Sequence, residues 1–226
     1  MEALVISVGE PQLERCLEAV KNQTIPFSNV VHIANVVPQH VAFNTGIKEI
    51  TDEWVMKVDG DMVLYNNAVE TVLDCISNNG NASVYIFNVY DDFIGGPMVG
   101  CKVYKTETVK TVEHENRLKN DLRVEKKLRM RGHKVNKLGV TIATHAENPD
   151  EFQIFRRFYV YGVKYGKGCG PWMNISKRFC DTGNEKCAFA MKALEFGIEK
   201  KIYPGSHNIE FDKKMYDEFK EAQKWT

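Results

Sequence analysis

The sequence predicts an α/β fold in which helices cover both faces of a mainly parallel sheet, followed by a mostly helical C-terminal extension. Short apolar runs rich in β-branched residues alternate with helical patterns over the first two thirds of the chain. This alternation is typical of a parallel sheet that is buried on both faces. After Pro149 aromatic residues become dense and two further helical patterns follow. We therefore predict a division into residues 1–148 and residues 149–226.

The elements follow from periodicity and from breaking residues. An apolar run stops at Gly9, and Pro11 opens a helical pattern, so a strand, a tight turn and a helix are expected there. The predicted strands cover residues 4–8, 30–37, 54–58, 83–89, 98–105 and 135–144. The predicted helices cover about 13–20, 42–50, 68–76, 115–131, 184–200 and 210–224. The glycine-rich stretch 162–170 is predicted to be a flexible loop.

Composition excludes several classes of protein. The 226 residues are 43% hydrophobic and 27% charged, which excludes disorder and fibrous or disulfide-rich miniature proteins. Thirty basic and thirty acidic residues balance, so no net field favours nucleic acid. No secretory leader and no membrane-spanning run is evident, which predicts a cytoplasmic protein with at most peripheral membrane contact. The six cysteines form no Cys-x-x-Cys pair, which favours reduced thiols.

Two carboxylates follow the third predicted strand. Asp59 and Asp61 flank Gly60 where an open α/β sheet holds its ligands, beyond the carboxyl end of a strand. Such a pair can hold a hard divalent cation, whose charge can offset that of a diphosphate. A polar turn is the plain alternative. The apolar run that continues directly after Asp61 favours a lined cavity or a metal, because unpaired buried carboxylates are costly.

Three further candidates carry titratable groups. Asp121 and Glu125 fall within the apolar arc of the helix near 115–131. For Glu125 we favour an ion pair with Arg129, one turn on. For Asp121 a contact with the helix dipole and a role as general base both remain open. His145 ends a strand, where it could bind a metal, although a lone histidine is more often structural.

Four motifs in order resemble the family 2 glycosyltransferases of the GT-A fold over roughly residues 3–146. They are Ala-Leu-Val-Ile-Ser-Val-Gly-Glu at 3–10 with the helix after it, Ala-Phe-Asn-Thr-Gly-Ile at 42–47, Trp-Val-Met-Lys-Val-Asp-Gly-Asp at 54–61, and Asn-Asp-Leu at 120–122 with Arg-Gly-His-Lys-Val at 131–135. The third is similar to the family's Asp-x-Asp strand, and the fourth to its Glu-Asp helix. The resemblance implies a GT-A-like three-layer sandwich with a mixed, mainly parallel central sheet.

The resemblance also implies a site and a reaction. It makes Asp121 the base that deprotonates an acceptor hydroxyl, and it makes Asp59, Asp61 and His145 ligands of Mn²⁺ or Mg²⁺. The nucleoside-diphosphate sugar, with a UDP-sugar favoured, would be bound by Ser7, Gly9, Glu10, Asn35, Asn44, Asp59 and Asp61. Single displacement would invert the anomeric carbon and transfer the sugar to a glycan, a lipid-linked acceptor or another hydroxyl.

The chain departs from the family pattern in three places. Phe43 replaces the usual arginine, Asn120 replaces the usual glutamate, and the segment His-Ile-Ala-Asn at 32–35 lacks the expected Asp-Asp, which leaves Asn35 as the nearest candidate for contact with the nucleotide base. The first two departures keep open a catalytically silent nucleotide-binding or scaffold module with the same fold. A nucleotidyltransferase and a dinucleotide-binding oxidoreductase are disfavoured, because the turn Gly9-Glu10-Pro11 lacks the glycine-rich phosphate cradle that each requires. The aromatic-rich C-terminal region, including Trp172, is predicted to form an acceptor side or lid, or simply a helical core.

Overall fold

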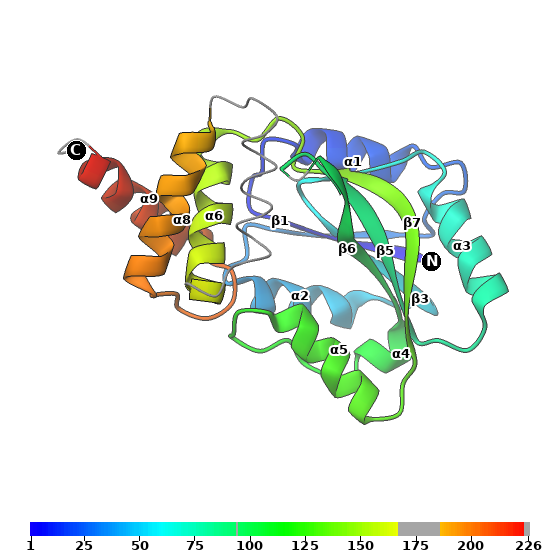
Figure 1. Ribbon diagram of the computed structural model, residues 1–226. Coiled ribbons are helices and arrows are strands. Elements are labelled where there is room, and N and C mark those ends of the chain that lie inside the picture. Colours follow the sequence, from blue (N-terminus) through cyan, green and yellow to red (C-terminus); the bar gives the residue numbers. More distant parts are fainter. Residues whose placement is uncertain (94, 167–185, 224–226) are drawn as a thin grey trace.

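The described strands form one mixed sheet. The computed structural model describes residues 1–93, 95–166 and 186–223. Within them a 7-stranded sheet has the order β2-β1-β3-β6-β5-β7-β4 (Figure 1). The strands are β1 (Glu2–Ser7), β2 (Val30–Ala34), β3 (Trp54–Asp59), β4 (Met62–Leu64), β5 (Val84–Asp91), β6 (Gly96–Lys105) and β7 (Val135–His145).

The pairing of the strands brings several carboxyl ends to one edge of the sheet. β1 is parallel to β2 and β3, and β5 is parallel to β7. β6 runs antiparallel to β3 and β5, and β4 runs antiparallel to β7. Only β4 and β6 therefore oppose the common direction, which confirms the mixed, mainly parallel sheet. β4 is an element that the sequence analysis did not separate from the turn after Asp61.

Helices cover both faces of the sheet (Figure 1). Apolar residues of α1 (Leu13–Lys21) and α3 (Ala68–Asn79) form one core with the sheet. Those of α2 (Gln39–Glu49), α4 (Thr106–Val109) and α5 (Asn120–Met130) form a second core on the opposite face. The three-layer arrangement is confirmed, although α5 begins five residues later than predicted and α4 was not foreseen.

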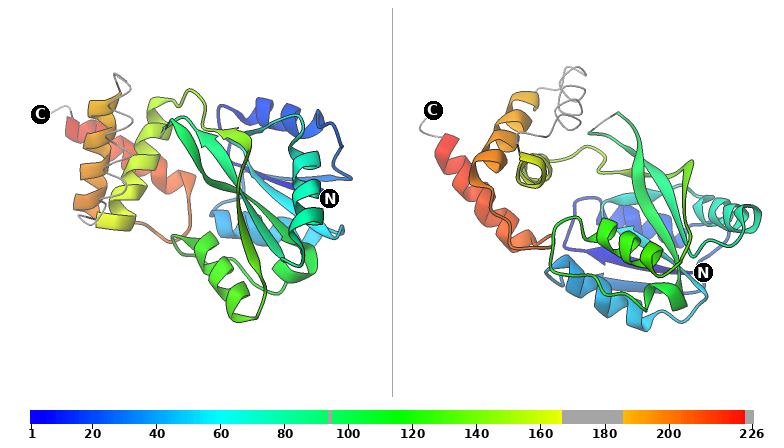
Figure 2. Two further views of the ribbon diagram at one scale, coloured as in Figure 1. Left: turned by 45° about the vertical axis from the view of Figure 1, so that its right-hand side comes forward. Right: turned by 60° about the horizontal axis from the view of Figure 1, so that its bottom comes forward.

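The C-terminal helices form a third core beside the sheet (Figure 2). They are α6 (Glu151–Tyr165), α8 (Cys187–Lys200) and α9 (Ile209–Gln223). Asp150 caps α6 by accepting a hydrogen bond from Gln153 N at 2.7 Å. Phe93 and Ala146 join this core from the sheet side, so the helices pack against the end of the sheet. The division at residue 148 stays a prediction.

Two expectations for the C-terminal part need correction. Gly162 lies inside α6, not in a loop. Helix α8 crosses so closely there that a Cβ would lie 2.3 Å from Leu194 O, which explains why this helical position is a glycine. Cys187 is disulfide-bonded, whereas Cys16, Cys75 and Cys101 are free. Residues 167–185, which include Trp172, lie outside the described residues. None of the described helices combines the length and the apolar character that crossing a membrane requires.

Candidate active site

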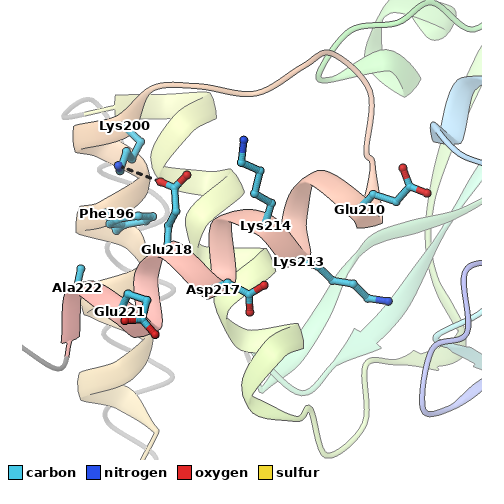
Figure 3. A pocket seen from close by; sticks show the side chains of 9 residues that line it. All are labelled: Phe196, Lys200, Glu210, Lys213, Lys214, Asp217, Glu218, Glu221 and Ala222. Atoms are coloured by element: carbon cyan, nitrogen blue, oxygen red, sulfur yellow. Dashed lines mark hydrogen bonds and ion pairs between the residues drawn. The ribbon is translucent and has the colours of Figure 1, made fainter.

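A cavity of about 620 Å³ opens at the carboxyl ends of β1, β3 and β7. Its lining includes Ser7, Glu10, Asp59, Asp61, Asp121 and His145. A second hollow, of about 680 Å³, lies on α8 and α9, and charged side chains from both helices line it (Figure 3). It contains none of the candidate residues from the sequence. The cavity at the sheet edge is therefore the candidate active site.

The turn between β3 and β4 packs tightly against the turn after β1. Gly60 N donates to Ile6 O at 2.9 Å. A Cβ at Gly60 would lie 2.5 Å from Glu10 Oε2 and 2.9 Å from the Cβ of Ser7. Glu10 Oε2 in turn accepts a hydrogen bond from Val8 N at 2.9 Å. The glycine between the two aspartates thus allows the two loops to meet, which places Asp59, Asp61 and Glu10 around one cavity.

Strand register brings Asp61 and His145 together. Met62 is the register partner of His145 in the β4–β7 pair, and Asp91 is its partner in the β5–β7 pair. The His145 Nδ1 atom lies 2.6 Å from Asp91 Oδ2, and its Nε2 atom lies 3.4 Å from Asp61 Oδ1. The fully buried Asp91 also accepts a hydrogen bond from Arg157 Nη1 at 2.7 Å. We call Asp61, His145, Asp91 and Arg157 the histidine cluster.

Charges in the histidine cluster shift each other's pKa. Burial opposes the charge on His145, but Asp61 and Asp91 outweigh it and raise its pKa to about 9. Burial likewise opposes the charge on Asp61, and the facing His145 with Arg156 and Arg157 holds the pKa of that carboxyl well below its usual range. At neutral pH the structure therefore holds a protonated histidine between two carboxylates.

Two buried lysines face each other across β3 and β6. Lys57 and Lys102 are register partners, and both side chains are almost fully buried. Like charges opposite one another destabilise a sheet unless carboxylates neutralise them. Lys57 Nζ donates to Asp59 Oδ1 at 2.8 Å and Oδ2 at 2.9 Å. Asp59 is thus paired with a lysine of its own strand, a contact that was not expected for a metal ligand.

Lys102 holds Asp121 and Glu125 in what we call the lysine cluster. Its Nζ lies 3.0 Å from Asp121 Oδ2 and 3.4 Å from Glu125 Oε1. Burial disfavours the charge on Asp121, but Lys102, Lys57 and His114 together hold the pKa of its carboxyl far below the ordinary value. The expected partner of Glu125 was wrong: Glu125 pairs with Lys102 and Lys137, while Arg129 donates to Val135 O. Asp121 is ionised but electrostatically satisfied.

The departure at Phe43 has a structural reason. The Phe43 ring stacks on the His114 ring, with centroids 3.7 Å apart and planes 18° apart. His114 Nδ1 lies 4.0 Å from Asp121 Oδ1. Burial, the largest influence, lowers the pKa of His114 to about 4, so the ring is neutral at neutral pH. Phe43 therefore supports a neutral histidine beside the candidate base.

The predicted nucleotide-binding residues separate into two groups. Ser7 and Glu10 line the cavity, and Ser7 Oγ lies 2.8 Å from His32 Nε2. Gly9 (φ +82°) and Asn35 (φ +58°) adopt left-handed conformations in the loops after β1 and β2, outside the cavity lining. Asn44 lies apart from it, in α2, where its side chain donates to His114 O and accepts from His114 N. The structure brings together Ser7, Glu10, Asp59, Asp61, Asp121 and His145, but not Asn44.

Sequence reasoning missed the basic residues of the cavity and the buried Asp91. The missed residues are Lys57, Asp91, Lys102, Arg117, Lys119, Lys137, Arg156, Arg157 and Lys164. The signal for Lys57 and Lys102 was a charged residue inside an otherwise apolar strand. For Arg156 and Arg157 it was a pair of arginines in an aromatic-rich helix. His207 also lines the cavity, although its sequence context was uninformative.

The residues of the histidine cluster offer a divalent cation two donor atoms. Asp91 fixes the ring of His145 through Nδ1, so that Nε2 and the Asp61 carboxylate face the same space. Carboxylate suits Mg²⁺ and Mn²⁺, and imidazole is a common metal ligand. In the part of the chain that the structure describes, no group of three or more His, Cys, Asp or Glu side chains is placed to hold a metal ion. The donor set therefore fits a cation that takes its remaining ligands from water or substrate.

Comparison with known proteins shows similarity in structure alone. No protein-family model matches the sequence, and no curated protein matches it. The TarS 1–349 structure from S. aureus is 13% identical with a TM-score of 0.52, over 89% of this chain and 71% of that one. The mannosyltransferase PcManGT from Pyrobaculum calidifontis, in complex with GDP-Man and Mn²⁺, is 11% identical with a TM-score of 0.54, over 87% and 73%.

The chain has a GT-A-like fold. A further TarS structure, in complex with UDP, is 11% identical with a TM-score of 0.51, over 85% of this chain and 69% of that one. At 11–13% sequence identity, the similarity to these structures shows the fold alone. The GT-A-like sheet places the histidine and lysine clusters at the edge where open α/β sheets bind ligands.

Proposed function

We propose that the protein is a glycosyltransferase that moves a sugar from a nucleoside-diphosphate sugar, with a UDP-sugar favoured, to an acceptor hydroxyl. The observation that carries the proposal is the histidine cluster. It places Asp61 and His145 3.4 Å apart on a cavity at the carboxyl end of a GT-A-like sheet. Two structural neighbours are complexes with UDP and with GDP-Man, which supports a nucleotide-sugar donor here.

Asp61 and His145 would hold a divalent cation, Mn²⁺ or Mg²⁺. When bound, the cation offsets the negative charge that develops on the leaving nucleoside diphosphate. Asp91 orients His145, and Arg157 keeps Asp91 ionised. Asp59 would become a further ligand of the cation after its contact with Lys57 is broken. Ser7, Gly9 and Glu10 would border the nucleotide, while Asn35 and Asn44 would shape the loops around it.

Asp121 would accept the proton of the acceptor hydroxyl as that hydroxyl attacks the anomeric carbon from the opposite face. The carbon–oxygen bond to the diphosphate breaks as the new glycosidic bond forms, and the configuration inverts. Asp121 is 39% exposed on the cavity, so an acceptor can reach it. Its contact with Lys102 lowers its basicity, and the reaction therefore requires Lys102 to turn toward Glu125 as the acceptor binds. The C-terminal helices would form the acceptor side.

The test is calorimetric titration with UDP, GDP, CDP and ADP, each with and without Mn²⁺. We expect one nucleotide to bind only with the metal, and the corresponding nucleotide-sugar to be turned over when acceptors are supplied. If no nucleotide binds under either condition, the proposed function is wrong.

A second candidate is a silent nucleotide-binding module. The observation in its favour is that Lys57 and Lys102 neutralise Asp59 and Asp121, the two carboxylates that would contact the donor and the acceptor. Metal-dependent nucleotide binding without sugar transfer or donor hydrolysis, over a broad acceptor panel, would favour this module.

A further inference from the structure

Basic side chains from the C-terminal half line the cavity. Besides Lys137, which contacts Glu125, they are Arg117, Lys119, Arg156, Arg157 and Lys164. Several of them have acidic partners. Arg156 Nε donates to Asp212 Oδ2 at 2.9 Å, and Arg157 Nη1 donates to Asp91 Oδ2 at 2.7 Å. Arg117 lies 3.7 Å from Glu115. These pairs account for three of the five positive charges.

Lys119 and Lys164 differ from these three. Within residues 1–93, 95–166 and 186–223, neither forms an ion pair with a carboxylate. Lys164 Nζ lies 3.4 Å from His207 Nε2, and Lys119 Nζ lies 4.2 Å from the centre of the Tyr165 ring. Neither partner supplies a negative charge. Among the described residues, the two lysines therefore have no carboxylate at ion-pair distance.

The charged groups around Lys164 are mainly basic. Burial is the largest influence and lowers the pKa of Lys164 to about 8; Asp121 is the strongest charged neighbour and opposes this shift, while Lys119, Arg157 and Arg156 add to it. His207 supplies no negative charge, because an imidazole is either neutral or positive, and burial with Lys164 keeps its pKa well below the usual value. A bound anion would stabilise the protonated lysine, and the site is partly shielded from water, so the attraction is stronger than at an open surface.

The position of the two lysines indicates which substrate the anion belongs to. Lys119 directly precedes α5, two residues before Asp121. On α6, Lys164 lies seven residues after Arg157, whose guanidinium contacts Asp91 beside His145; this separates them by about 10 Å along the helix. The two lysines thus lie toward the proposed base and about two helical turns from the contact of Arg157 with the histidine cluster, where the diphosphate of a donor would bind.

We propose that Lys119 and Lys164 form a binding site for a phosphate group carried by the acceptor, with the acceptor hydroxyl directed toward Asp121. This proposal rests on the proposed transferase function and adds the class of acceptor to it. Ammonium groups serve as point charges for phosphate, and two of them match a doubly charged phosphate ester. Tyr165, which Lys119 covers, supplies an apolar wall for the carbon chain next to the phosphate.

The experiment compares glycerol 3-phosphate with glycerol by calorimetry, using the whole chain with Mg²⁺, and follows the phosphate of glycerol 3-phosphate by ³¹P NMR. We expect glycerol 3-phosphate to bind, glycerol not to bind, and binding to persist when the preferred nucleoside diphosphate is saturating. Lys119→Gln and Lys164→Gln should each weaken glycerol 3-phosphate binding by roughly tenfold or more, without changing nucleotide affinity.

The control is Lys137→Gln, which removes a lysine that also lines the cavity but lies 3.9 Å from Glu125. It should leave glycerol 3-phosphate binding unchanged, because that charge is already compensated. Displacement of glycerol 3-phosphate by the nucleotide would assign the lysines to the donor diphosphate and overturn the proposal. Equal weakening by all three variants would also overturn the proposal, because such a result would indicate non-specific electrostatic attraction and no specific phosphate site. Nucleotide binding is measured separately, so the two failures can be told apart: glycerol 3-phosphate binding through the two lysines without any nucleotide binding would keep the phosphate site but refute both the transferase function and the assignment of this site to an acceptor.

Discussion

The histidine cluster and the lysine cluster border the same cavity but respond differently to their surroundings. In both, a carboxylate of the predicted catalytic edge is ionised because a cation faces it: His145 faces Asp61, and Lys102 faces Asp121. His145 has a pKa of about 9, and a metal ion bound at its Nε2 atom would replace the proton, which is released to water. Lys102 instead contacts two carboxylates at once, at 3.0 Å from Asp121 Oδ2 and 3.4 Å from Glu125 Oε1. The histidine cluster can thus change its charge by binding a metal ion, while the contacts of Lys102 with two carboxylates fix the position of Asp121.

This difference indicates where each cluster acts. A site that exchanges a proton for a metal ion suits a step whose charge varies during the reaction, such as departure of a diphosphate. A carboxylate that is paired with a lysine keeps its position but becomes less basic. An acceptor must therefore compete with Lys102 for Asp121. Substitutions in the two clusters should therefore have different consequences.

Asp121→Asn should reduce sugar transfer by roughly 10²–10⁴-fold while leaving nucleotide affinity within about twofold, because general-base groups contribute on that scale. The variant should fold, since Lys102 keeps its contact with Glu125. Transfer is measured by release of the nucleoside diphosphate, and affinity by calorimetry. Normal transfer by this variant would refute the role of Asp121 as base.

Lys102→Met should destabilise the protein by about 3 kcal/mol, because it leaves the buried Glu125 carboxylate without its nearest cation. Denaturant unfolding measures the change. The double variant Lys102→Met with Glu125→Leu should recover most of the loss. The matched control, Lys105→Met, removes an exposed pair with Glu107 and should change the free energy of unfolding by less than about 1 kcal/mol. Equal effects of Lys102→Met and Lys105→Met would show that the lysine cluster is not a constraint.

Removing His145 should change how stability depends on pH. Its folded pKa of about 9 lies above the ordinary 6.5, so the stabilisation from its charge is fully present below about pH 6.5 and is lost as pH rises through about 9. The difference in free energy of unfolding between the wild type and His145→Gln, with metal chelated, should therefore shrink by roughly 3 kcal/mol over that range. A constant difference would mean that His145 is not charged in the fold.

Asp61→Asn should weaken metal-dependent nucleotide binding by roughly 10–100-fold, the range found for groups that support a metal ligand, or by more. The control Asp74→Asn removes an exposed carboxylate of α3 and should have no effect. Calorimetry with and without Mn²⁺ separates the metal-dependent part of nucleotide binding from the metal-independent part. Unchanged metal dependence in Asp61→Asn would show that the histidine cluster does not bind the metal.

Periodicity predicted most of the fold, and strand ends predicted part of the site. The apolar runs place β1, β3, β5 and β7 correctly, and the idea that strand ends meet explains why Asp61 and His145 could be named in advance. That argument needs only the direction of the strands, which the alternating helices indicate.

The counter-charges could not be predicted in the same way. Lys57 and Lys102 are opposite each other only because β6 inserts antiparallel beside β3, in a register that nothing local specifies. Asp91 and Arg157 are 66 residues apart along the chain, and their contact depends on α6 packing against the sheet end. Sequence patterns identified the carboxylates; the tertiary fold decided what neutralises them.

Gly60→Ala should have the smallest effect and should act on the histidine cluster alone. Its Cβ would lie 2.5 Å from Glu10 Oε2 and 2.9 Å from the Cβ of Ser7, so the turn that carries Asp61 must shift. We expect a loss of about 1–2 kcal/mol in the free energy of unfolding, together with weaker metal-dependent nucleotide binding. Gly139→Ala, in β7, is the matched control, because no atom lies within 4 Å of its Cβ position and alanine reduces chain entropy. If both substitutions were neutral, the close contact between the two loops would not position Asp61, and the link between the glycine of the acidic turn and the histidine cluster would be wrong.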